Sequence, residues 1–366
     1  MSSPPKEIFL PAQQVLDASN TIAPANQNQH LPSPTDSESE ELGRQEGIKE
    51  GFQFAPSCYG RVKNPEAMVS KTWWKDVFGD ELYLQTDGDV VEDPAITLEE
   101  IRMLESRSAV RTIFETSNAL TASELEQPVR ILDLCCGQGR HILQLAELYP
   151  NLHLYGHDQS KYLIELARTR AQARSLIQRD GNPLPSPTPC DRIQFSIGDC
   201  RSTPFADNQF DLIMLMGNSF GYFSNEQEDV ELLKEISRIL KPGGVAVLDL
   251  VDGAYMRENY SPRGWEWIND GMIACRERWL SEDRKRLTCR EVIMLTTKGV
   301  IRDQFYQERL YDADEIRQLI SNVGLVVMNQ RQELHQEHRQ RTGSASDDDV
   351  EVNTKSKEMS QRGEDL

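Results

Sequence analysis

The stretch ILDLCCGQGRH, residues 131–141, combines an apolar run, a glycine-rich turn and the start of an amphipathic segment. The apolar run predicts a buried strand, and the pattern from Arg140 onward predicts a helix. The glycines allow a ligand to approach the backbone closely, and the first N–H groups of the helix are free to bind it. A tight strand-to-helix turn uses the same residues, so the motif alone leaves both interpretations open.

The sequence on either side repeats this order of strand and helix. Short apolar runs alternate with amphipathic stretches, which predicts an α/β fold: a Rossmann-like, doubly wound, mostly parallel sheet with helices on both faces. A capping box, Thr97-Leu98-Glu99-Glu100, marks the start of the first helix, and the motif KPGG, 241–244, marks the end of a later one. The predicted strands are 129–134, 152–157, 193–197, 210–216, 245–250 and 325–328, and the predicted helices are 97–116, 140–148, 161–176, 227–240 and 312–322.

Three β-type segments follow the fifth predicted strand, at residues 272–280, 287–296 and 301–311. They are close enough in sequence to pair antiparallel, so we expect a small added antiparallel sheet over 272–311. Trp265 and Trp267 stand at its entry, where they either close a pocket or pack in the core. The added sheet, or an exposed sheet edge, is also a possible surface for a homodimer.

Composition sets the limits of the folded part. Residues 1–65 and 331–366 are polar and cannot bury enough apolar surface to offset chain entropy. We therefore expect a disordered leader, a domain over 66–330, and a disordered acidic tail. The net charge is −19, from 40 basic and 59 acidic residues. Such a charge would repel a phosphate backbone, so we expect no nucleic-acid partner.

The seven cysteines show no paired CxxC spacing, so the sequence predicts no metal site. Their odd number favours a reducing compartment. The N-terminus lacks the pattern of a signal peptide, and no run of about 18 apolar residues predicts a membrane span. We expect a cytoplasmic protein without a membrane partner.

Two further acids support a ligand site. Asp158 ends the second predicted strand, 19 residues after Gly139, where a carboxylate can accept both hydroxyls of a ribose. Asp199 follows the third strand, and either acid alone could be an exposed loop residue. Together they surround one crevice at the carboxyl ends of the strands. A dinucleotide-binding dehydrogenase is the competing class, but Ile142 replaces the third glycine of its fingerprint.

At this point the chain resembles the class I S-adenosylmethionine-dependent methyltransferases, and within them a small-molecule type, over about residues 73–330. The motifs that carry the resemblance occur in order: DLCCGQGRH, HDQS, GDCRSTPF, FDLIMLMGNSFGYF and LKPGG. The resemblance implies that S-adenosylmethionine is the cofactor. It implies these roles: Asp133 and Gly137 to Gly139 line the methionine part, Asp158 holds the ribose, Asp199 and Cys200 flank the adenine, and Met216, Gly217 and Asn218 lie beside the sulfonium.

The same resemblance extends to the segments around the cofactor. The aromatic stretch 73–83, which ends in Tyr83, is similar to the family's N-terminal lid, although a helix packed on the domain's flank would have the same composition. The run GNSFGYF resembles the corresponding segment of amino-acid N-methyltransferases. This resemblance implies that Asn218 contacts the acceptor region, and Tyr222 and Phe223 are candidates for the pocket wall.

Methyl transfer from a sulfonium is a direct displacement that needs alignment and exclusion of water rather than a nucleophile of the enzyme. A hydroxyl acceptor usually needs a base, whereas an amine only has to be unprotonated. No histidine occurs between residues 159 and 330, so N-methylation is favoured over O-methylation. Asp249, Asp252 and Glu308 remain candidate bases.

The added sheet carries Arg276, Arg278, Arg290 and Arg309, any of which could bind an acceptor carboxylate through two hydrogen bonds. Glutamates adjoin them in sequence, so cross-strand ion pairs are the expected state of each arginine.

One feature departs from the family's pattern. The fold usually ends in two antiparallel strands after its final helix, but only 325–328 has a strand sequence here. A different class of function therefore stays open, namely a cofactor-binding protein that is inactive in methylation and acts as a regulatory partner or in non-methyl chemistry.

Overall fold

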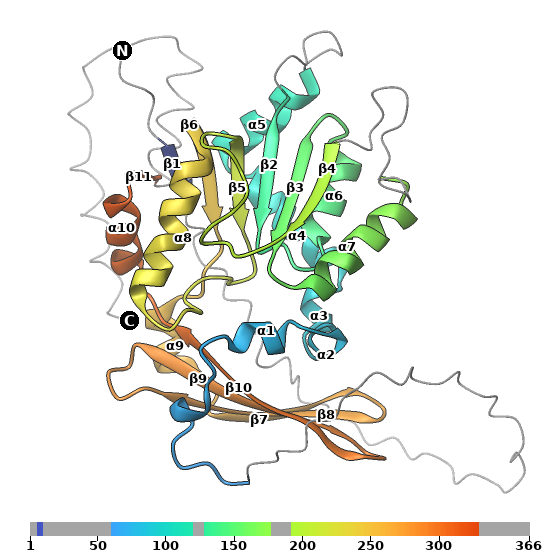
Figure 1. Cartoon of the computed structure of the whole chain (residues 1–366), viewed down its shortest axis with the longest axis vertical. Coiled ribbons are helices and arrows are strands. Elements are labelled where there is room, and N and C mark those ends of the chain that lie inside the picture. The colour runs from blue at the N-terminus through green and yellow to red at the C-terminus, as the bar shows by residue number, and fades with distance from the viewer. Residues whose placement is uncertain (1–5, 10–59, 120–127, 177–191, 329–366) are drawn as a thin grey trace, which may run out of the picture. The chain divides into compact units, whose positions relative to one another are not determined.

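Figure 1 shows the fold of the computed structural model, which describes residues 6–9, 60–119, 128–176 and 192–328. The chain divides into two units, residues 1–327 and 328–366, and only Met328 of the second is described. The predicted tail and most of the predicted leader thus lie outside the described residues. The fold below is that of the first unit.

The main sheet has seven strands in the order β11-β1-β6-β5-β2-β3-β4 (Figure 1). From β1 to β4 every neighbouring pair is parallel. Strands covered on both faces need continuous apolar sequence, and Ile131, Leu132 and Leu134 of β2 are fully buried. The predicted parallel sheet is confirmed. Its strands are β1 Lys6–Phe9, β2 Arg130–Leu134, β3 His153–Asp158, β4 Ile193–Ile197, β5 Phe210–Leu215, β6 Leu240–Leu248 and β11 Leu325–Met328.

Helices flank this sheet. In the described chain α6 and α7 pack on β3, α5 on β5 and α8 on β6. Side chains cap several starts: Ser160 accepts from the N–H of Leu163 at α7, and Asn225 accepts from that of Glu228 at α8. The elements are η1 Glu66–Met68, α1 Trp73–Val77, α2 Glu81–Thr86, α3 Gly88–Val91, α4 Pro94–Glu105, α5 Ser108–Ala119, α6 Arg140–Leu148, α7 Lys161–Ala173, α8 Glu226–Ile239, α9 Gly253–Asn259 and α10 Ala313–Asn322.

The added sheet is antiparallel, with the order β10-β9-β8-β7, which confirms the predicted insertion. It has one more strand than expected, because the segment of Trp265 and Trp267 pairs with β8. Both tryptophans are more than half exposed, so neither core packing nor pocket closure describes them. The strands are β7 Arg263–Asn269, β8 Met272–Leu280, β9 Arg286–Leu295 and β10 Gly299–Arg309.

The predicted helix 97–116 is wrong at its start and in its continuity. The side chain of Asp93 accepts from the N–H of Ala95, and Pro94 occupies the first turn, so α4 begins three residues before Thr97. The hydroxyl of Thr97 instead donates to the Asp93 carbonyl. The helix also ends at Glu105, and a second helix, α5, begins at Ser108.

The motif KPGG also has a different place from the one predicted. It lies inside β6, which begins at Leu240 directly after α8, and the pairing with β5 is irregular there. The ammonium of Lys241 binds both carboxylate oxygens of Asp211 on β5, at 2.8 and 2.7 Å. Pairing with β5 thus extends the strand through residues whose local preference is a turn.

The strand β1 corrects the prediction that residues 1–65 are a disordered leader. It lies between β6 and β11, with Ile8 opposite Ala246. Ile8 is fully buried in the main core, and the Lys6 ammonium donates to the carbonyl of Ser237 and to Asn208 Oδ1. A segment from the N-terminus therefore occupies the position for which the C-terminal sequence offers no strand.

We expect Ile8→Ala to lower the free energy of unfolding by about 2–5 kcal/mol, because it removes buried apolar surface and leaves a cavity. The matched control is Val326→Ala on β11, because the side chain of Val326 is 45% exposed. This change should lower the free energy of unfolding by about 0.5 kcal/mol or less. Urea denaturation measures both. Equal stability of the two variants would mean that β1 is not part of the cooperative core.

Candidate active site

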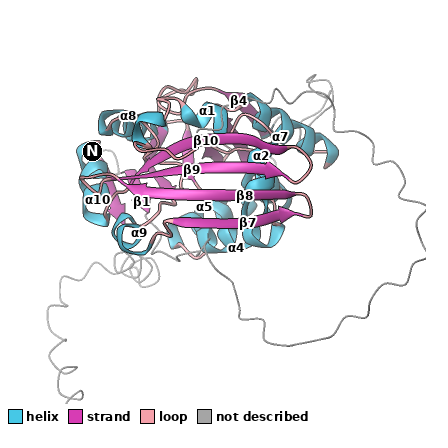
Figure 2. Cartoon of the chain, turned by 90° about the horizontal axis from the view of Figure 1, so that it is seen from below, coloured by secondary structure: helices cyan, strands magenta, loops and turns pink. Residues whose placement is uncertain are grey.

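A cavity of about 1040 Å³ lies at the carboxyl ends of the parallel strands. The loops after β2, β3, β4 and β5 form one wall, the helices α1 to α3 a second, and β8 to β10 a third. Figure 2 views the molecule from the side of the added sheet, where β7 to β10 lie side by side. Residues from distant parts of the sequence converge here because the carboxyl ends of parallel strands share one edge.

Ten of the eleven site residues predicted from the sequence line this one cavity. Gly139 is the exception: a Cβ there would lie 3.0 Å from Phe195 and 3.1 Å from Ala167, with φ at +75°. This glycine therefore allows the turn to pack on β4 and α7, and it does not face the cavity. The ten lining residues are Tyr83, Asp133, Gly137, Asp158, Asp199, Cys200, Met216, Gly217, Asn218 and Tyr222.

The glycine-rich turn is held to the end of β3 by Asp158. One carboxylate oxygen accepts from the N–H of Gly137 at 2.9 Å, and the other accepts from the N–H of Ser160 at 2.7 Å. Burial raises the pKa of Asp158, against the effect of these hydrogen bonds. Each oxygen keeps a lone pair for a further donor, so the carboxylate can still bind hydroxyls from the cavity.

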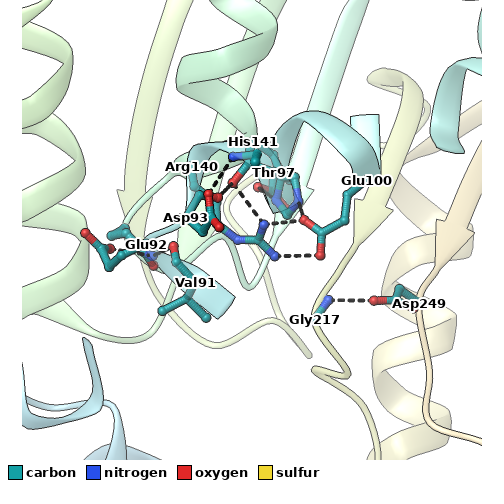
Figure 3. Close-up of polar contacts among 12 residues, drawn as sticks. Val91, Glu92, Asp93, Thr97, Glu100, Arg140, His141, Gly217 and Asp249 are labelled. Carbon is teal, nitrogen blue, oxygen red and sulfur yellow. Dashed lines mark hydrogen bonds and ion pairs between the residues drawn. The ribbon is translucent and has the colours of Figure 1, made fainter. Parts of the chain in front are cut away.

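A buried polar network lies behind the turn (Figure 3). Nε2 of His141 is 2.9 Å from Glu100, and Nδ1 is 3.5 Å from Oδ2 of Asp133. Arg140 also binds both oxygens of Glu100. Burial alone would raise the pKa of Glu100, but the hydrogen bonds from His141 and Arg140 outweigh it and lower the pKa to about 2. This network helps to position Asp133. The network could not be predicted from the sequence, because Glu100 belongs to a helix distant in the chain.

Asp199 has a close protein partner. Its carboxylate accepts from Nη2 of Arg201 at 2.6 Å, and Nη1 of Arg201 donates to Glu228 at 2.7 Å. The hydrogen bond from Arg201 lowers the pKa of Asp199. The guanidinium lies 4.4 Å from the ring centroid of Phe223, so this end of the cavity carries a fixed cation over an aromatic ring.

The loop after β5 contains two consecutive residues with positive φ, Gly217 at +64° and Asn218 at +55°. Asn218 is anchored at both amide atoms: Oδ1 accepts from the N–H of Val251 at 3.0 Å, and Nδ2 donates to Oε2 of Glu308 at 2.7 Å. The N–H of Gly217 donates to Asp249 (Figure 3). Asn218 therefore connects two loops of the main sheet to β10.

The wall opposite the turn contains aromatic rings and one carboxylate. The ring of Trp73 lies 4.9 Å from Tyr222 and 5.6 Å from Tyr306, measured between centroids. Glu308 lines the cavity beside them, and burial raises its pKa. Asp249 also lines the cavity, whereas Asp252 caps α9 and does not. Of the three candidate bases, two thus face the cavity.

The aromatic stretch 73–83 covers the cavity and is fastened to it. The hydroxyl of Ser160 donates to the carbonyl of Phe78 at 2.6 Å, and the amide of Gln159 donates to the carbonyl of Trp74 at 3.3 Å. Tyr83 packs edge-on against Phe78, with 4.8 Å between centroids. The stretch thus covers the strand ends, as the resemblance to a lid implies. The residues that donate hydrogen bonds to it belong to the motifs quoted from the sequence.

Two negative observations apply to the described residues alone. Their His, Cys, Asp and Glu side chains form no group arranged to hold a metal ion. None of their helices combines the length and the apolar character needed to cross a membrane.

Residues 131–244 match the family model of the methyltransferase domain. Demethylmenaquinone methyltransferases of Geobacillus kaustophilus and Thermus thermophilus are each 32% identical to this chain, over 119 and 121 residues. These matches cover 32% and 33% of this chain but 43% and 46% of the relatives, so the chain spans less than half of their length.

Among solved structures, a sugar N-methyltransferase from a Streptoalloteichus species aligns with a TM-score of 0.45 and 18% identity, over 67% of this chain and 85% of its own. The domain match runs from β2 to the first half of β6, and so includes the glycine-rich turn and the loops that line the cavity. Residues 131–244 are therefore a methyltransferase domain.

Proposed function

We propose that this chain is an enzyme that transfers the methyl group of S-adenosylmethionine to a small molecule, with an amine nitrogen as the favoured acceptor. The observation that carries the proposal is one cavity with two different walls. Asp133, Gly137 and Asp158 belong to the first wall, and Tyr222 and Glu308 to the second. A methyl donor and its acceptor need adjoining sites of this kind.

The residues at the strand ends fit the cofactor. Oδ2 of Asp133 is almost completely buried, and its described neighbour, Nδ1 of His141 at 3.5 Å, makes no well-aligned hydrogen bond with it. Buried acceptors usually have a donor, so a ligand amine is a suitable partner. A Cβ at Gly217 would meet nothing within 4 Å, so this backbone borders open space. The cavity volume also lies at the upper end of the usual range for ligand sites, about 300–1,000 Å³.

We assign the roles from these contacts. Asp133, with Gly137, would hold the methionine part, Asp158 the ribose hydroxyls, and Asp199 with Cys200 the adenine. Met216 and Gly217 would lie beside the reacting sulfur, and Tyr83 would close the cover over the ligand. When bound, S-adenosylmethionine supplies an electrophilic methyl group on a sulfonium. The chain's own contribution is then to align an acceptor and to exclude water.

Glu308 is the residue we favour for proton handling at the acceptor. Its Oε2 accepts from Asn218, and Oε1 accepts no hydrogen bond from the described residues. A raised pKa suits Oε1 to take the proton of an incoming ammonium. His141, the histidine among the lining residues, is held by Glu100 and Asp133 and is less suited. Asn218 acts through Glu308 as a positioning residue, and Tyr222 forms the adjoining wall.

We also propose a cytoplasmic location, a small-molecule acceptor rather than nucleic acid, and a homodimer. All described cysteines are free thiols, which supports a reducing, cytoplasmic location. The acidic net charge supports a small-molecule acceptor over nucleic acid. The half-exposed Trp265 and Trp267 on β7, an edge strand, support a homodimer through the added sheet. We retain a folded domain over 66–330 with β1 added to it.

Replacement of Asp158 tests the cofactor site. Asp158→Ala should weaken S-adenosylmethionine binding by about 1–3 kcal/mol, because a charged hydrogen-bond acceptor is lost. Asp207→Ala is the control, since Asp207 is exposed and does not line the cavity. Calorimetric titration with S-adenosylmethionine and, separately, NAD measures the affinities. Absence of saturable S-adenosylmethionine binding in the folded protein would refute the proposal, and binding without any turnover would favour a regulatory protein.

Replacement of Glu308 tests the acceptor site. Glu308→Gln should lower kcat/KM for the acceptor by about a hundredfold or more, the usual range for loss of a general base, and leave S-adenosylmethionine affinity unchanged. The carboxylate is the active form and burial raises its pKa, so the activity of the native chain should fall as the pH drops through that pKa. The glutamine variant should lose this acidic limb. Release of S-adenosylhomocysteine across pH 5 to 9 is the measurement, and a parallel loss of cofactor affinity would indicate a structural role instead.

A further inference from the structure

The cavity-facing surface of the added sheet holds a positive charge that the proposed methyl transfer does not use. The strand registers place Arg278 opposite Cys289, and Cys289 opposite Tyr306. Glu308 follows Tyr306 by two residues, so it lies on the same face of the sheet. Arg278, Tyr306 and Glu308 all line the cavity. This face therefore presents the Arg278 cation and the Glu308 carboxylate to the same space, beside Glu291, which is paired with Arg276.

Three of the four candidate arginines named from the sequence are already neutralised. Arg276 binds Glu291 at 2.6 Å and also Glu266. Arg290 binds Asp303 at 2.7 Å. Arg309 is paired with Asp229 at 3.3 Å. For these three the expected ion pairs account for the charge, and they are not available for a ligand.

Arg278 differs from them. Its guanidinium donates from Nη1 to the carbonyl of Ser261 at 3.3 Å, and within the described residues it makes no ion pair. An arginine has five N–H donors in a planar fork, so most of them stay available. Such a fork matches the two oxygens of a carboxylate. A cavity-lining arginine without an acidic partner is suited to bind an anionic group of a ligand.

The separation of Arg278 and Glu308 suits one small molecule. They are two strands apart and offset by two residues, which puts their Cα atoms roughly 12 Å apart. They make no ion pair with each other; burial raises the pKa of Glu308, and the charge of Arg278 offsets a part of that rise. A molecule with an ammonium and a carboxylate would satisfy both groups at once. If Arg278 and Glu308 formed an ion pair with each other, neither would be available to a ligand. The described residues do not contain this ion pair.

We propose that Arg278 binds a carboxylate of the acceptor, so that the acceptor is an amine that also carries a carboxylate, as in an amino acid or a similar zwitterion. This inference rests on the proposed function and specifies the acceptor for the same site. Glu308 then faces the amine and Arg278 the carboxylate. The pair orients the nitrogen toward the loop of Met216 and Gly217.

The test compares matched ligands that differ only in this group. The full chain, saturated with S-adenosylhomocysteine, is screened by ligand-observed NMR against the common amino acids and their carboxamides. Bound ligands should be acids, with an affinity about 10- to 100-fold above that of the matched amide, the range for a hydrogen-bonded charge. Arg278→Gln should remove this preference, and Arg278→Lys should keep part of it because the charge remains.

Arg263→Gln is the control, since Arg263 is 79% exposed and outside the cavity lining, and it should keep the full preference. Binding of acids and amides with equal affinity, absence of acid binding, or a preference that survives Arg278→Gln would each overturn the assignment. S-adenosylmethionine affinity is measured on the same samples. If the chain does not bind S-adenosylmethionine, the proposed function is contradicted. If it binds S-adenosylmethionine but shows no Arg278-dependent preference for acids, this inference alone is contradicted.

Discussion

The side chain of Asn218 is the contact on which the site depends. Its two amide atoms join the loops after β5 and β6 to Glu308 of β10, so one residue connects the parallel sheet to the added sheet. The backbone has to adopt positive φ at Gly217 and Asn218 for this to occur. Glycine and asparagine are the residues that adopt this conformation most readily, and only asparagine adds a donor and an acceptor. Within the described residues, this contact is the hydrogen bond that fixes the Glu308 carboxylate itself relative to the strand ends.

The sequence predicted the parallel sheet well because its signals are local. Apolar runs such as residues 131–134 and caps such as Ser160 act within a few residues and need no knowledge of the rest of the chain. The strand β1 could not be predicted in this way. Lys6–Phe9 is a four-residue segment with only two apolar side chains, next to a long polar stretch, and its partner on β6 is more than 230 residues away. Burial of Ile8 by that partner decides its structure, against the composition around it.

The same distinction separates the two halves of the site. The half that we propose for the cofactor was predictable, because motifs that end consecutive parallel strands must meet at one edge, and all of its residues except Gly139 line the cavity. The acceptor half was not. Which arginine of the added sheet remains without an acidic partner depends on the register of β8 to β10 and on Asp229 from another helix. Sequence neighbours indicated ion pairs for each of the four candidate arginines, and only the pairing showed that Arg278 differs from the other three.

The charges of the cavity explain why such a site would release its product. Burial raises the pKa of Asp158, Asp249 and Glu308, so ionising any of these carboxyl groups without a cation nearby costs free energy. A cationic occupant offsets this cost, and both a sulfonium and an ammonium are cations. Methyl transfer would leave the sulfur neutral and the methylated nitrogen cationic, and Glu308 would hold the proton that the acceptor ammonium gave up. The cavity carboxylates that attract the sulfonium of the methyl donor would therefore not attract the neutral thioether product. The Asp133–His141–Glu100 network would hold the side chains of the empty site in place.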